Sequence, residues 1–354
     1  MTLPDITKEN LGNKKVLMRV DFNVEFENGN PKEKYKIESV KKTVDFVQSQ
    51  KGAKLALLSH MGRPNGLGKA EMSFKDLTES IAGVLGKELV FVSDCIGDVV
   101  GSSLDALEDG QILLLENPRF YKAEISGEKD FAESLAKNFD VYVNEAFSTS
   151  HRNHGSITKI AEILPSFAGV NLLKEVEVLS GLRESFEKPA VAIIGGAKVE
   201  TKIPVIEFFA KNYDKVLVGG RIGIEIKEKG IVVQNNVVLP EDYAGQGLDI
   251  GPKTIKVFSD LLMGAKTIVW NGPLGKFENP EFAKGTDGVL DAINQNETAY
   301  KVAGGGETVQ LLGEKGFIEK FDFVSTGGGA MLEFLAKGTL SGLEVLNNFT
   351  RYDI

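Results

Sequence analysis

Residues 300–308 read YKVAGGGET, an apolar run that ends in three glycines and leads into a segment that favours a helix. Glycines let backbone N–H groups approach an anion without a Cβ in the way. The following helix would add its unpaired N–H groups and the positive end of its dipole. The pattern indicates a phosphate site, with a helix cap that holds no ligand as the alternative.

The same pattern of a strand, a glycine turn and a helix recurs through the second half of the chain. The other apolar runs are residues 191–194, 216–218, 268–270 and 323–325. Such turns lie at the carboxyl ends of strands in open α/β sheets, where ligands bind. The repetition therefore predicts a parallel sheet with several anion-binding loops along one edge.

The first half of the chain predicts a second parallel sheet. Apolar runs alternate there with helical stretches such as 74–85 and 129–138, as in βαβ units. The predicted strands are residues 15–20, 55–58, 89–92, 112–115 and 141–143. Residues 171–186 read as one helix that joins the two halves. We expect two doubly wound α/β lobes on either side of this hinge helix, with a cleft between them.

The composition excludes several classes of protein. The chain has 354 residues, 42% of them hydrophobic and 26% charged, which is ordinary for a globular protein with room for two domains. A net charge of −9 argues against a nucleic-acid binder. The polar start and the lack of a long apolar run argue against secretion and membrane insertion. With Cys95 as its single cysteine, the chain fits a reducing cytoplasm.

The placement of the arginines and histidines predicts an anion pocket. Only seven of the 41 basic residues are arginine, and three of these follow predicted strands of the first half. They are Arg63, Arg119 and Arg152, and the histidines in the same turns are His60, His151 and His154. A guanidinium group matches the oxygens of a phosphate or carboxylate with two parallel hydrogen bonds. Solvated loop charges are the alternative.

Other known site patterns are missing from the sequence. It has no P-loop motif, no dinucleotide-binding GxGxxG, no protein-kinase signature and no nucleophile elbow. His151 and His154 lack a third metal ligand at a suitable spacing, which disfavours zinc. Direct transfer between two bound ligands therefore fits better than covalent catalysis.

Nine longer motifs resemble those of the phosphoglycerate kinase family, in the same order and along nearly the whole chain. The first-half motifs are RVDFNV at 19–24, SHMGRP at 59–64, LENPRF at 115–120 and NEAF at 144–147 with HRNH at 151–154. The second-half motifs are GGAKVETK at 195–202, DIGPKT at 249–254, WNGPLGKFE at 270–278, GGGET at 304–308 and STGGGA at 325–330.

The resemblance implies a cytoplasmic, monomeric kinase that works by domain closure in glycolysis. Residues 1–170 would bind 3-phosphoglycerate, 171–187 would form the connecting helix, and 188–340 would bind ATP or ADP with Mg²⁺. Residues 341–354 would form a tail that returns to the first lobe.

The same resemblance implies the site residues. Those for the phosphoglycerate are Asp21, Asn23, Lys36, His60, Arg63, Arg119 and Arg152. Those for the nucleotide are Gly196, Lys198, Lys202, Gly220, Asn271, Pro273, Glu278, Gly305, Gly306, Glu307 and Thr308. Among these, Lys36, Lys202 and Gly306 would serve the transfer step, and Glu307 would bind the metal.

The chain departs from the family pattern in three places. Lys36 stands where the family has an arginine, Glu307 stands where it has an aspartate, and the stretch 221–248 is altered and shorter. At Lys36 the positive charge is kept, but the planar guanidinium group with its paired hydrogen-bond donors is lost. The alternative to an active kinase is a relative that binds phosphoglycerate or nucleotide but has lost efficient catalysis. A two-lobe binding protein of the periplasmic type is a more distant alternative, because the sequence shows no signal peptide.

Overall fold

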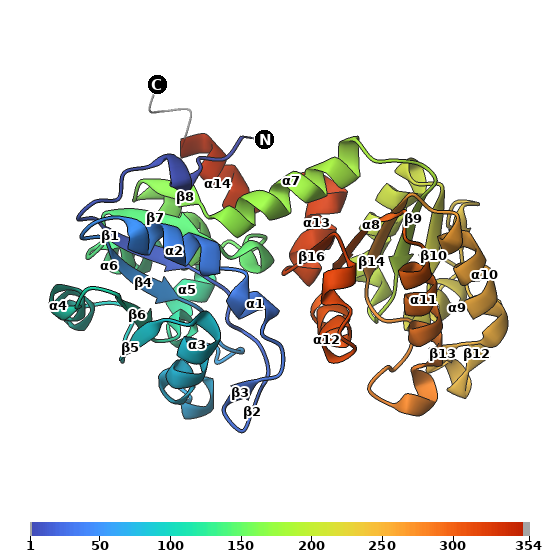
Figure 1. Cartoon of the computed structure of the whole chain (residues 1–354), viewed down its shortest axis with the longest axis horizontal. Coiled ribbons are helices and arrows are strands. Elements are labelled where there is room, and N and C mark those ends of the chain that lie inside the picture. The colour runs from blue at the N-terminus through green and yellow to red at the C-terminus, as the bar shows by residue number, and fades with distance from the viewer. Residues whose placement is uncertain (1, 350–354) are drawn as a thin grey trace. The chain divides into compact units, whose positions relative to one another are not determined.

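The computed structural model describes residues 2–349, and its chain divides into two compact units. The first unit contains the residues up to Glu177 together with the segment from Thr339 onward, and the second is Val178–Gly338. Each unit has one six-stranded parallel sheet with helices packed against it (Figure 1). The predicted fold class, two parallel-sheet α/β domains, is confirmed. No helix among the described residues is long and apolar enough to span a membrane.

The sheet of the first unit has the strand order β5-β6-β4-β1-β7-β8. Its strands are β1 (Lys15–Arg19), β4 (Lys54–Leu58), β5 (Glu88–Val92), β6 (Gln111–Leu115), β7 (Val141–Asn144) and β8 (Ser166–Ala168). The five predicted strands are confirmed, and β8 is an addition. In the register, Arg19 pairs with Leu58 on one side and with Asn144 on the other. The loops that follow β1, β4 and β7 therefore begin at the same level of one edge.

Apolar side chains from this sheet form a core with the helices beside it. Val16, Met18, Leu55 and Leu57 are buried together with residues of α2 and α3. The helices of the unit are α1 (Tyr35–Glu38), α2 (Lys41–Ser49), α3 (Thr78–Leu85), α4 (Asp98–Ala106), α5 (Lys122–Ser126), α6 (Lys129–Ala136) and α14 (Ser341–Phe349). Burial of each such side chain contributes about 1.5–3 kcal/mol, which fixes the strand register.

A small hairpin precedes α1. Its strands, β2 (Phe26–Glu27) and β3 (Asn30–Pro31), pair antiparallel across Asn28 and Gly29, whose φ angles are +50° and +77°. A two-residue hairpin turn of this kind requires the left-handed conformation at both positions, which Asn-Gly adopts readily. The hairpin leads directly into the helix that carries Lys36.

The sheet of the second unit has the strand order β11-β10-β9-β14-β15-β16. Its strands are β9 (Ala190–Ile194), β10 (Lys215–Val218), β11 (Val237–Val238), β14 (Thr267–Asn271), β15 (Tyr300–Gly304) and β16 (Phe323–Ser325). The five predicted strands are confirmed here too. Because the chain builds outward in opposite directions from β9 and β14, these neighbours form the topological switch point where ligands bind in such sheets.

The remaining elements of the second unit connect these strands. The helices are α8 (Val199–Asn212), α9 (Gly220–Glu228), α10 (Pro252–Met263), α11 (Lys284–Gln295), α12 (Gly306–Glu314) and α13 (Gly328–Lys337). A two-residue antiparallel pair, β12 (Tyr243–Ala244) with β13 (Asp249–Ile250), lies in the connection between β11 and α10.

Helix α7 (Val170–Glu184) crosses the boundary between the units and ends three residues before the predicted limit of 187. Helix α14 packs on the first unit beside β8, where the Gly342 N–H donates to the Ser150 carbonyl at 2.7 Å. Of the tail expected at 341–354, residues 350–354 lie outside the described residues.

Candidate functional site

Asp21 is the centre of a polar cluster at the carboxyl edge of the first sheet. One of its oxygens accepts from Lys36 Nζ at 3.1 Å and from the Ser148 hydroxyl, and the other accepts from the Asn23 N–H at 3.1 Å. The contact with the Asn23 N–H forms an Asx turn. Asp21 therefore shapes its own loop and also binds Lys36 and Ser148. Burial alone would raise the pKa of Asp21, but the Lys36 charge and the Ser148 hydrogen bond hold it well below its usual range.

Lys36 is the cationic partner in this cluster. Burial would lower its pKa, but the charge and hydrogen bond of Asp21 outweigh burial and raise it. Both groups are therefore ionised at neutral pH. The side chain of Lys36 is 16% exposed and that of Asp21 8% exposed, so the pair is poorly screened by solvent.

His60 follows β4 and lies beside the same carboxylate. Its Nδ1 is 3.2 Å from Arg19 Nη2 and 3.7 Å from Asp21 Oδ1. Burial holds the pKa of His60 well below its usual value, the charges of Arg19 and Arg119 act in the same direction, and Asp21 opposes them. The imidazole is therefore neutral at pH 7.

Arg19, the last residue of β1, is a member of the cluster that the sequence patterns did not single out. It is fully buried, and its guanidinium group donates to Ser156 Oγ at 3.0 Å, to the Leu58 carbonyl at 3.3 Å and to the Val20 carbonyl. An arginine that ends an otherwise apolar strand was the available signal, because so costly a burial requires several partners.

Gly62 connects two further predicted residues. Its N–H donates to Asn23 Oδ1 at 2.9 Å, and its carbonyl accepts from Arg119 Nη1 at 2.7 Å. Burial lowers the pKa of Arg119 to about 10, with the charges of Arg19 and Arg152 acting in the same direction. Arg119 is thus still a cation at pH 7, close to two others.

The other two predicted arginines are exposed. Arg63 follows Gly62 directly, and Arg152 lies in the turn after β7 and contributes to the lowered pKa of Arg119. The structure thus joins Asp21, Asn23, Lys36, His60 and Arg119 through direct contacts or the short backbone of Gly62. It leaves the side chains of Arg63 and Arg152 open to solvent at the same edge.

A buried carboxylate supports the turn after β7. Glu124 accepts from the Ser156 N–H at 2.7 Å and from Ser156 Oγ at 2.6 Å, and it lies 3.7 Å from His154 Nδ1. The His154 carbonyl accepts from the Ile157 and Thr158 N–H groups. Burial lowers the pKa of His154 to about 4, and the nearby arginines add to this effect. His154 therefore supports the loop as a neutral residue.

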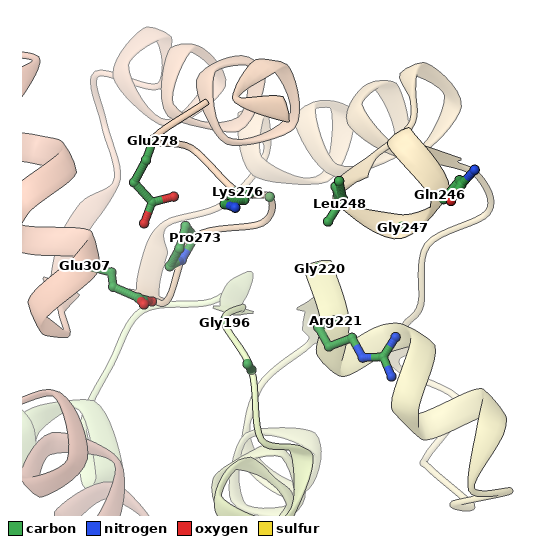
Figure 2. A pocket seen from close by; sticks show the side chains of 12 residues that line it. Gly196, Gly220, Arg221, Gln246, Gly247, Leu248, Pro273, Lys276, Glu278 and Glu307 are labelled. Atoms are coloured by element: carbon green, nitrogen blue, oxygen red, sulfur yellow. The ribbon is translucent and has the colours of Figure 1, made fainter. Parts of the chain in front are cut away.

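A pocket of about 350 Å³ lies at the switch point of the second sheet (Figure 2), within the size range of small-molecule sites. Five predicted residues line it, namely Gly196, Gly220, Pro273, Glu278 and Glu307. The lining residues that were not predicted as site residues are Ala197, Arg221, Gln246, Gly247, Leu248, Gly275 and Lys276. The residues labelled in Figure 2 come from the loops after β9 and β14, from the starts of α9 and α12, and from the short connection between β12 and β13, which carries Gln246, Gly247 and Leu248.

The backbone of two glycine loops meets at this pocket. The Gly195 N–H donates to the Asn271 carbonyl at 2.9 Å, and the Gly196 N–H donates to the Pro273 carbonyl at 2.8 Å. A Cβ added at Gly195 would lie 2.1 Å from the Pro273 oxygen. Only glycine allows this approach, which brings the ends of β9 and β14 together.

Polar side chains next to the pocket link the loops after β14 and β15. Lys202 Nζ donates to Asn271 Oδ1 at 2.7 Å, and Thr308 Oγ1 accepts from the Gly272 N–H at 2.8 Å. Burial lowers the pKa of Lys202 to about 8, and the charge of Glu307 opposes this shift. Lys202 thus keeps most of its charge at pH 7 but loses it in mildly alkaline solution.

The start of α12 is open enough to receive an anion. A Cβ added at Gly306, its first residue, would meet no atom within 4 Å. The preceding Gly305 has a φ of +111°, and its added Cβ would meet Asn271 and Thr308 at 3.3 and 3.4 Å. The first amides of a helix have no carbonyl of an earlier turn to bind, so they are free to donate to a phosphate. Lys198, also predicted, caps the start of α8 with a left-handed backbone.

A model of the phosphoglycerate kinase family matches residues 6–246 and, in a second segment, residues 224–338. The phosphoglycerate kinase of Trichodesmium erythraeum is 37% identical, with 98% of this chain and 99% of the relative covered. That of Leptospira biflexa is 38% identical, with 98% of each covered.

Two solved structures of phosphoglycerate kinases have the same fold. The one from Pyrococcus horikoshii matches with a TM-score of 0.87 at 28% identity, covering 99% of this chain and 100% of that chain. The one from Coxiella burnetii matches with a TM-score of 0.78 at 31% identity, covering 98% and 99%.

The comparisons also locate a difference from the relatives. The alignment with the Trichodesmium protein runs over 394 positions, whereas this chain has 354 residues, so the chain lacks residues that the relative has. The two segments matched by the family model overlap at residues 224–246, inside the stretch predicted to be shorter. Sequence matches at 37–38% identity and structural matches over nearly the full length nevertheless agree, and they confirm the predicted resemblance. The chain belongs to the phosphoglycerate kinase family.

Proposed function

We propose that the protein transfers a phosphoryl group reversibly between ATP and the carboxylate of 3-phosphoglycerate, giving ADP and 1,3-bisphosphoglycerate. The observation that carries the proposal is that, in each unit of this family member, groups suited to binding an anion gather at one edge of the sheet. The first has a cluster of cations around Asp21, and the second has a glycine-lined pocket beside Lys202 and the start of α12.

In the first unit, the proposed ligand is the phosphoglycerate. Arg63, Arg119 and Arg152 would bind its phosphate and carboxylate oxygens, because guanidinium groups match both. Asp21 and Asn23 would bind the hydroxyl group, and His60 would donate a hydrogen bond. The contacts of Gly62 to Asn23 and Arg119 support this assignment, because they fix the loop between them.

In the second unit, the proposed ligand is the nucleotide. Lys198, Lys202, Gly305, Gly306 and Thr308 would bind its phosphates. Gly196, Gly220, Asn271 and Pro273 would line its site, and Glu278 would bind the ribose hydroxyl groups. The position of Glu278 and the glycines in one pocket supports this division.

The residues present fit the Mg²⁺ that such a reaction uses. Glu307 lines the pocket beside Gly196, and its charge acts on Lys202. Mg²⁺ is usually held by one or two carboxylates together with phosphates and water, so a single carboxylate here is sufficient. Glu307 would hold the ion, which would neutralise charge on the phosphate oxygens.

The chemistry requires little covalent help from the protein. The acceptor carboxylate is already ionised at pH 7, so no general base is needed. One of its oxygens forms the new bond to the γ-phosphorus, and the bond from that phosphorus to the bridging oxygen breaks, which leaves ADP. Lys36, Lys202 and the Gly306 N–H would stabilise the negative charge on the transferring group.

A coupled assay of ATP-dependent 3-phosphoglycerate phosphorylation tests this proposal. We expect turnover in the wild type and a loss of about a hundredfold or more in kcat/KM for Arg119→Met, since a charged hydrogen-bond donor to the substrate is removed. Lys256→Met is the matched control, because it removes one charge from an exposed ion pair on α10. Binding of 3-phosphoglycerate or ATP without wild-type turnover would instead support the binding relative. A monomeric state and a cytoplasmic location stay predictions.

A further inference from the structure

We propose that Arg19 is a positioning residue that holds the imidazole of His60 in its Nε2–H tautomer. His60 would then offer a directed N–H donor to the anionic substrate instead of a positive charge. The assignment of the substrate rests on the proposed function, whereas the assignment of the tautomer rests on the contacts of Arg19 alone.

The guanidinium group of Arg19 has a fixed orientation. It is fully buried and donates through Nε to Ser156 Oγ, through Nη1 to two carbonyl groups, and through Nη2 toward His60. The two carbonyls belong to Val20, directly after β1, and to Leu58, the last residue of β4. Because both strands are held in the sheet, the planar group has no freedom to turn away from His60.

The contact between Arg19 and His60 decides which ring nitrogen carries the proton. A guanidinium group has only donors, so Nδ1 of His60 must accept the hydrogen bond at 3.2 Å. A proton on Nδ1 would place two hydrogens between these atoms. Asp21 Oδ1, the other neighbour, is 3.7 Å away, beyond hydrogen-bond distance, and already accepts from the Asn23 N–H. A neutral His60 therefore carries its proton on Nε2.

The charges around His60 favour the neutral form. Arg19 and Arg119 approach it from β1 and from the turn after β6, Lys36 approaches from α1, and all three oppose protonation. Asp21 favours protonation, but burial of the ring, which is 3% exposed, outweighs it. The geometry and the charges thus point to the same state.

This state has a consequence for the substrate. A neutral donor binds a phosphate or carboxylate oxygen with a strength that does not change as the pH crosses the usual histidine range. The arginines of the cluster supply the charge, and His60 supplies direction. Without Arg19, the Nδ1 position becomes available for a proton that faces Asp21, and both the tautomer and the charge of the ring become variable.

The first test measures the tautomer of the wild type directly. The chain has only three histidines, so a nitrogen–proton correlation spectrum of protein labelled with ¹⁵N-histidine resolves each ring, and the signals lost in His60→Gln identify His60. At pH 7 we expect a bare Nδ1 and a protonated Nε2. A protonated Nδ1, or a doubly protonated ring, would overturn the proposal, and this result depends neither on turnover by the enzyme nor on any change at Arg19.

The second test separates positioning from simple electrostatics. Arg19→Met should give a mixture of tautomers and should raise the pKa of His60, because one of the charges that oppose its protonation is removed. Arg119→Met is the matched control, because it removes a nearby charge that also acts on His60 but does not contact Nδ1. In Arg119→Met, the tautomer of His60 should stay as in the wild type. An equal change in both variants would reduce the role of Arg19 to its charge and would sink the proposal.

Kinetics supply the third readout. The KM for 3-phosphoglycerate should be insensitive to His60 titration in the wild type, and in Arg19→Met it should rise about tenfold or more and acquire a pH-dependent step. Arg19→Lys keeps the charge but not the fork, so it should not restore the pH-independent KM. Full restoration by lysine would contradict the proposal. If no variant and no wild type turns over, the proposed function fails, while the spectrum still decides the tautomer.

Discussion

Lys36 Nζ lies 3.1 Å from Asp21 Oδ2, and this ion pair ties α1 to the loop after β1. The resemblance to the family implies an arginine at the place of Lys36. An ammonium group has three donors, and one of them binds Asp21, so the others remain able to meet a ligand. Lys36 thus keeps the charge and a fixed position, although it lacks the flat fork of a guanidinium group.

We expect Lys36→Met to lower kcat/KM by about a thousandfold, because it removes a cation from the transfer site, where arginines of other phosphotransferases contribute 10³ to 10⁵ in rate. Lys36→Arg should keep the activity within about tenfold of the wild type, since both the charge and the contact to Asp21 survive. The coupled assay at saturating Mg²⁺ measures both.

Lys34→Met is the control for this pair, because Lys34 is exposed and precedes α1 by one residue. It should behave like the wild type. A wild-type rate in Lys36→Met would remove Lys36 from the site, and an inactive wild type that is rescued by Lys36→Arg would place a catalytic defect at this position.

The activity should fall in alkaline solution through Lys202. Burial lowers the pKa of Lys202 to about 8, so a rise in pH through this value removes its positive charge. The neutral amine attracts phosphate oxygens less than the cation does, and kcat/KM for ATP should therefore decline above about pH 8. A pH profile at limiting ATP measures this decline.

Lys202→Arg tests the assignment, because arginine stays charged to a pKa above about 12. The alkaline limb of its profile should move to higher pH, even if the rate itself is lower. Lys202→Met should be slow throughout and should lack the step. An unchanged alkaline limb in Lys202→Arg would mean that another group titrates.

Most strands of the two sheets were predictable because they read as continuous apolar runs, and β1, β4, β9 and β14 are buried along nearly their whole length. Strand β8 has only three residues, Ser166–Ala168, and the hairpin at Phe26–Pro31 depends on its turn at Asn28 and Gly29. Neither element contains an apolar run from which it could be predicted. Asn-Gly was the signal for the hairpin turn.

The site was predictable where side chains carry recognisable chemistry in a motif. Arg19 and Glu124 were not predicted as site residues, because their roles follow from contacts across more than 30 positions of sequence. Ser156 is the partner that they share. The pocket residues Gln246 and Lys276 come from separate connections that meet only in the folded unit, where the Lys276 N–H donates to the Leu248 carbonyl.

Glu145 should make the stability depend on pH. Its carboxylate accepts from the Asn171 and Leu172 N–H groups at 3.0 and 2.9 Å, at the start of α7, and from the Thr43 hydroxyl. Burial raises the pKa of Glu145 to about 7 from a usual 4.5, and these hydrogen bonds only partly oppose the shift. The folded state thus binds more protons than the unfolded state between these values, and the free energy of unfolding falls as the pH rises through them.

Glu145→Gln replaces the carboxyl group with an amide that does not titrate, so the folded state no longer binds the extra proton. Its free energy of unfolding should therefore rise relative to the wild type by about 3 kcal/mol between pH 4.5 and pH 8, as urea denaturation at both pH values would measure. Glu184→Gln, which changes an exposed carboxylate at the end of the same helix, should show no such trend. A constant difference between Glu145→Gln and wild type would show that the buried carboxyl group does not titrate in this range.

Gly195→Ala should damage the nucleotide pocket through the backbone alone. An added Cβ would lie 2.1 Å from the Pro273 oxygen and 2.5 Å from the Gly272 oxygen, and backbone hydrogen bonds hold these loops together on both sides. The loops after β9 and β14 would have to separate, which costs about 1–3 kcal/mol of stability and displaces the pocket wall at Pro273. We expect the KM for ATP to rise about tenfold, because ligand binding would have to restore the displaced wall.

Gly313→Ala is the matched control for this change. Gly313 lies near the end of α12, and its added Cβ would meet nothing closer than Ile318 Cδ1 at 3.6 Å. Since alanine favours a helix over glycine by up to about 1 kcal/mol, this variant should be as stable as the wild type or slightly more so, with an unchanged KM. Urea denaturation and ATP titration of both variants measure the contrast. An unaltered KM and stability in Gly195→Ala would show that the two loops have room to separate, and that their close approach is not what shapes the pocket.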